Sequence, residues 1–165
     1  MPRLLVVTAS TRPGRIGAPI GEWAVGAAKA HGKFDVVSVD LAELDLPFLD
    51  EPGHPRMGRY EHEHTREWSA IVQDADAFLF VTPEYDHFMP ASLVNAIQFL
   101  FWEWAYKPFG AVSYGGISAG LRGYQELKVL GVAMKMVPVI DGPVIPFALT
   151  MIKDGVFEPT PIVAA

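Results

Sequence analysis

Three polar stretches of the sequence combine residue types that can do chemistry. TPEYDHFMP, at positions 82–90, follows an apolar run and presents two carboxylates, a tyrosine and a histidine. An ordinary turn needs glycine, asparagine or proline rather than these groups. STRPGRIG, at 10–17, carries two hydroxyls and two arginines, and YGGISAG, at 114–120, carries three glycines. These stretches are the candidates for a binding site.

The first stretch, STRPGRIG, precedes a helix that we expect to begin near Ala18. Free N–H groups and the positive end of the dipole at a helix N-terminus suit a phosphate, and hydroxyl and guanidinium groups add charge-assisted hydrogen bonds. The alternative is a solvated loop with capping hydroxyls. Arg12 and Arg15, so close together in an acidic chain, favour the phosphate. GxxxxGK[ST] and GxGxxG are both absent here, which disfavours ATP or GTP hydrolysis and a Rossmann site for NAD.

Strand-like and helix-like segments alternate along the chain and must position these stretches. Strands are predicted over Leu4–Thr8, Phe34–Val39, Asp76–Thr82, Phe109–Ser113 and Val137–Ile140. Helices are predicted from Ala18 to Gly32, around Trp68, Ile71, Val72 and Ala75, from Pro90 with Leu93, Ile97, Leu100 and Phe101 on one side, and around Tyr124, Leu127, Leu130 and Met134. This alternation predicts an α/β fold with a parallel sheet and helices on both faces.

The three polar stretches follow the first, third and fourth predicted strands. The carboxyl ends of parallel strands meet at one edge of the sheet, where ligands bind in such folds. Glycines let a backbone approach a flat ligand closely. YGGISAG alone could equally be a flexible turn, but beside the other two stretches it favours a cofactor wall. No crossover helix is found over 141–165, so this tail either lies over the sheet edge or lacks an ending that relatives have.

The composition bounds the class of protein. The 165 residues are predicted to form one domain, 1–165, since half are hydrophobic and only 19% are charged. The net charge of -6 and the lack of a basic run predict no nucleic-acid partner. The absence of cysteine excludes disulfides, thiol catalysis and cysteine-bound metal. No signal peptide or membrane span is recognised, so we expect no membrane partner and a cytoplasmic location.

In their order and spacing, TASTRPGRIG, TPEYDHFMPASLVNAI and SYGGISAGLRG resemble the NADPH-dependent FMN reductases, a group of flavodoxin-like quinone and azo-type reductases. The resemblance covers Leu4 to Ile140. It implies a flavodoxin-like three-layer sandwich whose five-stranded parallel sheet has the order 2-1-3-4-5. It also implies bound FMN, homodimers or homotetramers, and hydride transfer from NADPH or NADH through FMN to a small-molecule electron acceptor such as a flavin or quinone.

The resemblance also implies roles for individual residues. The FMN phosphate would be held by Ser10, Arg12, Arg15, Ile16 and Gly17. The isoalloxazine and ribityl would be bordered by Pro83, Glu84, Tyr85 and Asp86, and the other side would be closed by Tyr114, Gly115 and Gly116. Because the flavin carries the chemistry, no protein acid, base or nucleophile is required and no catalytic residue is assigned.

Three positions depart from the family pattern: Ala9 replaces a glycine, Val94 a lysine and Asp86 an asparagine. We hypothesise that Asp86, if it points inward, lowers the reduction potential of FMN. Glu84 could instead be structural and accept backbone N–H bonds across a dimer.

Several side chains keep two interpretations. Arg15 or Arg122 could contact the 2′-phosphate of NADPH or be plain surface arginines, and His87 could touch substrate or only solvent. His62 and His64 are two positions apart and do not share a helical face, so no metal site is predicted. The rings of Phe101, Trp102 and Trp104 cannot all face one core. Part of this aromatic run either lies at a subunit interface or over a neighbouring flavin, or caps the core at a helix end.

Two other functions stay open. One is a flavodoxin-type electron carrier, which steady-state NADPH oxidation with FMN or a quinone would distinguish from a reductase. The other is a flavin-free regulatory or assembly domain, which a colourless protein that takes up no FMN would favour.

Overall fold

A parallel sheet forms the centre of the protein in a computed structural model that describes residues 1–164. Its strands follow the order β2-β1-β3-β4-β5, and a further short strand, β6, also pairs with β4. The strands are β1 (Arg3–Thr8), β2 (Asp35–Asp40), β3 (Ala77–Pro83), β4 (Pro108–Tyr114), β5 (Val137–Pro138) and β6 (Val144–Ile145). The predicted order 2-1-3-4-5 is confirmed.

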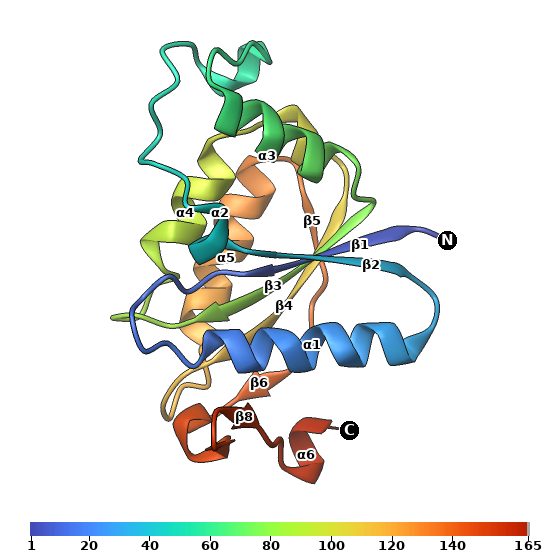
Figure 1. The fold of residues 1–165 in the computed structure, drawn as a ribbon, viewed down its shortest axis with the longest axis vertical. Coiled ribbons are helices and arrows are strands. Elements are labelled where there is room, and N and C mark those ends of the chain that lie inside the picture. Colours follow the sequence, from blue (N-terminus) through green and yellow to red (C-terminus); the bar gives the residue numbers. More distant parts are fainter. Residues whose placement is uncertain (165) are drawn as a thin grey trace.

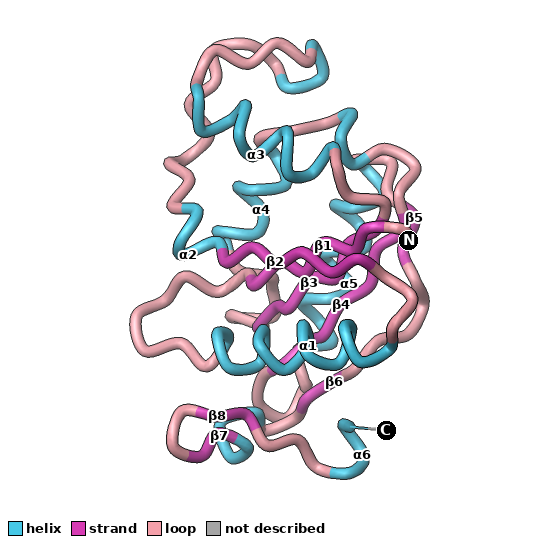
Figure 2. Tube along the Cα trace, turned by 45° about the vertical axis from the view of Figure 1, so that its right-hand side comes forward, coloured by secondary structure: helices cyan, strands magenta, loops and turns pink. Residues whose placement is uncertain are grey.

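Helices cover both faces of this sheet, as Figures 1 and 2 show. One face carries α1 (Gly17–His31), and the other carries α3 (Glu63–Gln73), α4 (Ala91–Gln98) and α5 (Leu121–Ala133). The remaining elements are α2 (Leu41–Leu44), η1 (Pro55–Met57), η2 (Trp102–Trp104), η3 (Ala148–Met151), β7 (Ile152–Lys153), β8 (Val156–Phe157) and α6 (Pro161–Ala164). None of the helices within residues 1–164 has the length and apolar character needed to cross a bilayer.

The alternation of side chains along β1 explains why both faces are covered. Leu5 and Val7 enter the core beneath α3, α4 and α5, whereas Leu4 and Val6 enter the core beneath α1. Successive side chains of a strand point to opposite faces, and here both sets are apolar. The short branched run at the N-terminus therefore becomes a central strand buried on both sides.

Two predicted elements end earlier than expected. The fifth strand stops at Pro138 instead of Ile140, although the Val139 N–H still donates to the Phe109 carbonyl at 2.7 Å. The helix after Pro90 ends at Gln98, so Leu100 and Phe101 follow it rather than extend its apolar face. Both of these side chains are nevertheless buried.

The aromatic run after α4 is divided between core and surface. Phe99, Phe101 and Trp104 are buried and cap the core, while Trp102 and Tyr106 are exposed. Trp102 and Trp104 lie at the two ends of the short 3-10 helix η2, and their rings point in different directions, one to solvent and one to the core. Most of this aromatic run therefore caps the core. Within the run, Trp102 and Tyr106 are the exposed rings that could contact another subunit.

His62 and His64 lie close together, although positions two apart on a helix would not share a face. His62 precedes α3, which begins at Glu63, so its ring is free to stack on His64 with centroids 5.2 Å apart. His64 Nε2 lies 2.9 Å from an Asp50 carboxylate oxygen. Among the residues that the structure describes, no group of three or more potential ligands could hold a metal ion.

The tail occupies the face of the sheet that α1 leaves partly open. β6 extends the sheet edge beside β4, and Phe157 then packs edge-to-face on Trp23 of α1 with ring centroids 5.3 Å apart. Figure 1 shows this segment, in red, below α1. The first of the two alternatives for the tail, a position over the sheet edge, is the one found.

Candidate functional site

The three polar stretches meet in one cavity at the carboxyl edge of the sheet. The cavity has a volume of about 410 Å³ and contains ten of the twelve predicted site residues; Gly17 and Asp86 are not among those that line it. The lining residues are Ser10, Arg12, Arg15, Ile16, Pro83, Glu84, Tyr85, Tyr114, Gly115, Gly116, Phe147, Leu149 and Thr150. The prediction that these loops come together is confirmed.

The two arginines of the first loop have different surroundings. Arg15 Nη1 pairs with Asp40 at 2.5 Å and donates to the Ser10 carbonyl at 2.6 Å. The hydrogen bond to Asp40 is the main reason that the pKa of Arg15 is raised. Arg12 forms no ion pair within residues 1–164, and its guanidinium lies 5.9 Å from the centre of the Tyr85 ring. Arg12 is therefore the cation of this loop whose charge is not already neutralised.

A buried hydroxyl and a glycine form a tight cradle where α1 begins. The Tyr114 hydroxyl is buried and has no hydrogen-bond partner among the described residues. A β-carbon on Gly17 would lie only 2.5 Å from this oxygen and 3.2 Å from Ser10 Cβ. Burial, followed by the nearby Tyr85, raises the pKa of Tyr114. The hydroxyl is therefore protonated and can donate a hydrogen bond.

The start of α1 adds backbone donors to this cradle. Its N-cap, Ile16, provides no side-chain cap, and the first turn contains no acidic residue. The first N–H groups of a helix have no partner inside it. Together with the Tyr114 hydroxyl and Arg12, they form a donor set that suits an anion such as the phosphate of FMN.

The hydroxyls of Ser10 and Tyr85 connect the first and second loops. Their oxygens lie 2.6 Å apart, so one donates to the other across the cavity. Ser10 is buried on the first loop, whereas Tyr85 follows β3. The bond fixes the separation of two walls that are far apart in the sequence.

Glu84 connects the second loop to the third. Its side chain is only 5% exposed and pairs with Arg122 at 2.5 Å. It also accepts hydrogen bonds from the Ser118 hydroxyl at 2.9 Å and from the backbone N–H groups of Arg122 and Gly123 at 3.0 and 3.4 Å. The N-cap of α5, Gly120, has no side chain to offer, so Glu84 caps this helix from another loop.

Burial raises the pKa of Glu84, but the hydrogen bonds from Arg122, Ser118 and the α5 backbone outweigh that influence and lower it. The carboxylate is therefore charged and structural. Within its own chain, Glu84 acts as an acceptor of backbone N–H groups at the start of α5.

Asp86 and His87 form the tip of a tight turn outside the cavity. Tyr85 and Phe88 exchange backbone hydrogen bonds of 2.9 Å, and the two residues between them have φ angles of 50° and 72°. These values belong to the left-handed region, which asparagine and aspartate tolerate better than most residues. Asp86 is exposed and does not line the cavity, so the inward carboxylate that the sequence suggested is not found.

Comparisons with known proteins agree with this geometry. The family model for NADPH-dependent FMN reductases matches residues 2–149. The chain belongs to this family. It is 38% identical over 161 residues to an NAD(P)H-dependent FMN reductase of Schizosaccharomyces pombe, covering 96% of this chain and 80% of the relative. A shorter match, 32% identical over 92 residues, is to a 2-hydroxy-1,4-benzoquinone reductase of a Burkholderia species and covers 53% of this chain and 48% of that one.

Solved structures confirm the flavodoxin-like fold. FerB, a flavoenzyme NAD(P)H:(acceptor) oxidoreductase from Paracoccus denitrificans, superposes with a TM-score of 0.74, at 18% identity, over 96% of this chain and 87% of its own. The predicted class of activity therefore holds: this FMN reductase family member is an NAD(P)H-dependent oxidoreductase with FMN as its cofactor.

Several residues that shape the site of this reductase escaped sequence reasoning. Phe147, Leu149 and Thr150 close the cavity from the C-terminal segment, which carries no recognisable motif. Asp40 could have been found, because it directly follows a predicted strand at the same sheet edge. The contacts of Ser118 and Arg122 with Glu84 were also missed, because Glu84 is distant in the sequence.

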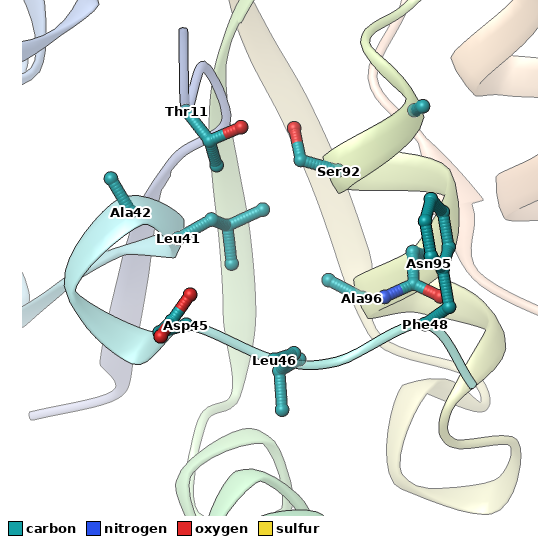
Figure 3. Close-up of a pocket in the computed structure, with 10 residues that line it drawn as sticks. Thr11, Leu41, Ala42, Asp45, Leu46, Phe48, Ser92, Asn95 and Ala96 are labelled. Atoms are coloured by element: carbon teal, nitrogen blue, oxygen red, sulfur yellow. The ribbon is translucent and has the colours of Figure 1, made fainter. Parts of the chain in front are cut away.

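A second cavity, of about 420 Å³, lies on the other side of the first loop. Figure 3 shows Leu41, Ala42 and Asp45 along one side of it and Ser92, Asn95 and Ala96 of α4 along the other. The Asn95 side chain accepts from the Leu49 N–H at 3.0 Å and donates to the Pro47 carbonyl at 2.7 Å. Asn95, which belongs to the family-like stretch TPEYDHFMPASLVNAI, thus holds the loop that follows α2. This cavity contains none of the twelve predicted site residues.

Proposed function

We propose that FMN binds in the cavity of about 410 Å³ where the three loops meet, and that NAD(P)H and a small acceptor react there in turn. The observation that carries this proposal is the convergence of ten predicted residues on one cavity. Ser10, Arg12, Arg15, Ile16 and Gly17 would hold the phosphate at the start of α1. Pro83, Glu84, Tyr85, Tyr114, Gly115 and Gly116 would border the ring and ribityl.

The surroundings of Gly17 favour a phosphate site over a solvated loop. A buried tyrosine hydroxyl without an acceptor costs free energy, about 1–3 kcal/mol for an unmade hydrogen bond. A phosphate oxygen at the α1 N-terminus would supply that acceptor. Because Gly17 has no β-carbon, the start of α1 can lie directly against this hydroxyl.

The protein residues position the reactants rather than exchange protons with them. When bound, FMN supplies a ring that takes up and passes on two electrons. The net reaction is NAD(P)H + H⁺ + quinone giving NAD(P)⁺ + hydroquinone. Ser10 and Tyr85 fix the width of the cavity, Glu84 fixes the glycine-rich loop, and Phe147 lines one side.

The nucleotide preference is not decided by a free arginine. Arg15 and Arg122 are both engaged, with Asp40 and Glu84 respectively. Both guanidinium groups are already paired with a carboxylate, so neither offers an unpaired charge to a 2′-phosphate. We propose that both NADPH and NADH are used, and a ratio of kcat/KM for the two nucleotides within about 10-fold would support this.

The test of the cofactor proposal is the visible absorbance of the purified protein, followed by titration of the flavin-free chain with FMN. Bound FMN together with steady-state NADPH oxidation by a quinone would support a reductase. Bound FMN without turnover would favour the electron carrier. No uptake of FMN would favour the flavin-free domain and overturn the proposal.

We also propose that the reductase is a homodimer or homotetramer in the cytoplasm. Exposed apolar side chains at Phe48 and Phe88 support an interface, since they flank a hollow of about 290 Å³ against α4. Light scattering on the purified protein would measure its mass. A monomer at micromolar concentration would contradict the interface.

A further inference from the structure

A third cavity, with a volume of about 640 Å³, lies beneath the C-terminal segment. Its lining is formed by Gly142, Pro143, Val144, Pro146, Phe147, Thr150, Met151, Thr160, Ile162 and Val163. Apart from two threonines, every one of these residues is apolar or a glycine, and none is charged. Burying a charge here would cost several kcal/mol, whereas burying hydrocarbon is favourable. The cavity therefore suits an uncharged, apolar ligand.

This C-terminal cavity adjoins the cavity proposed for the flavin. Phe147 and Thr150 line both of them. The N–H groups of Phe147 and Ala148 donate to the carbonyls of Gly116 and Gly115, both at 3.0 Å, so this wall is fixed to the glycine-rich loop. A molecule that reaches the flavin cavity along Phe147 could extend directly into the C-terminal cavity.

Phe147 has an unusual backbone for a wall residue. Its φ is 48°, in the left-handed region, although it carries a bulky side chain. Such conformations cost on the order of 1 kcal/mol and persist where the surroundings impose them, often at ligand sites. Here the two hydrogen bonds to the glycine-rich loop impose it. Its ring is 56% exposed, which leaves apolar surface available to a ligand.

The far wall of the cavity is formed by residues that follow the stretch matched by the family model. The family model ends at residue 149, whereas Met151, Thr160, Ile162 and Val163 follow it. Ile162 is 90% exposed, so apolar surface at this wall is in contact with water.

We propose that the C-terminal cavity binds the alkyl or isoprenoid tail of a quinone-type electron acceptor whose ring enters the flavin cavity past Phe147. This inference rests on the proposed function for the identity of the ring, but the cavity itself does not depend on it. The acceptor class that follows is a lipophilic quinone rather than a charged or sugar-bearing molecule.

The experiment compares two benzoquinones that share one ring and differ only in a methyl or a ten-carbon alkyl substituent. With the FMN-loaded protein, we expect kcat/KM to be on the order of 10-fold or more higher for the long-chain quinone, since each methylene removed from water contributes roughly 4-fold. Ile162→Asp, a change at an exposed position, should abolish most of this preference and leave the short-chain rate unchanged. Val156→Asp is the matched control, because Val156 is also exposed on the same segment but does not line the cavity.

A second measurement does not depend on turnover. In equilibrium dialysis, the flavin-free protein should retain the long-chain quinone, its Val156→Asp variant should retain it equally, and its Ile162→Asp variant should lose it. Equal kcat/KM for the two quinones, or a preference that survives Ile162→Asp, would overturn the proposal. So would a change of molecular mass in Ile162→Asp, which would assign the apolar wall to contact between copies. If the protein bound the long-chain quinone but did not oxidise NAD(P)H, the proposed function would be wrong and the C-terminal cavity would still be a quinone-binding site.

Discussion

The carboxylate of Glu84 and the guanidinium of Arg122 meet at 2.5 Å and join two cavity walls whose residues are 38 positions apart. Glu84 leaves β3 at the second loop, and Arg122 begins α5 after the glycine-rich loop. The same carboxylate caps α5, so helix start and cavity width depend on one side chain.

Glu84→Gln is expected to lower both stability and FMN affinity. The amide cannot accept from the Arg122 guanidinium, the Ser118 hydroxyl and two backbone N–H groups at once, so the free energy of unfolding should fall by about 1–3 kcal/mol. FMN affinity should fall on the order of 10-fold, because the loop must then be ordered on binding. Urea denaturation and FMN titration measure the two effects. Glu67→Gln, at an exposed position on α3, is the control and should change neither.

The pH dependence of stability provides a separate check on Glu84. Its pKa is lower in the folded protein than in the unfolded chain, so the carboxylate stabilises the fold above the unfolded value of about 4.3. That contribution is lost as the pH falls from there through the lower folded pKa. In Glu84→Gln, the free energy of unfolding should therefore decline less steeply over this acidic range. An unchanged slope would mean that the ion pair does not persist in solution.

Gly17→Ala should impair FMN binding without unfolding the protein. The new methyl would press on the Tyr114 hydroxyl and on Ser10, and such overpacking costs about 1–3 kcal/mol. We expect the FMN dissociation constant to rise roughly 10-fold or more. Gly26→Ala tests the same substitution in the same helix, where a β-carbon meets nothing within 4 Å. It should be neutral or stabilise by about 0.5–1 kcal/mol, with normal FMN binding.

Asp86→Asn should leave the FMN reduction potential almost unchanged. The side chain lies at the exposed tip of the turn, where water and salt screen its charge. We expect a shift of less than about 30 mV, the two-electron equivalent of ~1.4 kcal/mol. Spectroelectrochemical titration of both proteins measures it. A rise well beyond that value would show that the carboxylate acts on the flavin, as the sequence first suggested.

Asn95→Ala should loosen the loop after α2. The substitution removes the hydrogen bonds to Leu49 and Pro47 and leaves α4 otherwise intact. Hydrogen exchange at the Leu49 amide should accelerate by on the order of 10-fold, which corresponds to the loss of about 1 kcal/mol of local stability. Gln98→Ala, exposed on the same helix, should have no such effect. Exchange that is equally fast in both variants would indicate that Asn95 does not hold this loop.

The sequence by itself determined the architecture and the neighbourhood of the site. Apolar runs such as Leu4–Thr8 and Phe109–Ser113 are local patterns, and chain connectivity then puts the loops that follow them at one sheet edge. That is why ten of the twelve predicted residues could be brought together before any coordinates were considered. The three motifs also indicated the family, because their order and spacing match those of the FMN reductases.

Only the tertiary structure decided what individual side chains do. Glu84 caps α5 and Arg15 pairs with Asp40, and the sequence revealed neither contact because each joins distant segments. Asp86 faces solvent because two left-handed residues turn the backbone there, which no periodicity in the sequence reveals. The wall at Phe147 likewise depends on hydrogen bonds to Gly115 and Gly116 across the fold. Local pattern sets where elements form, but long-range contacts set which groups are free to bind.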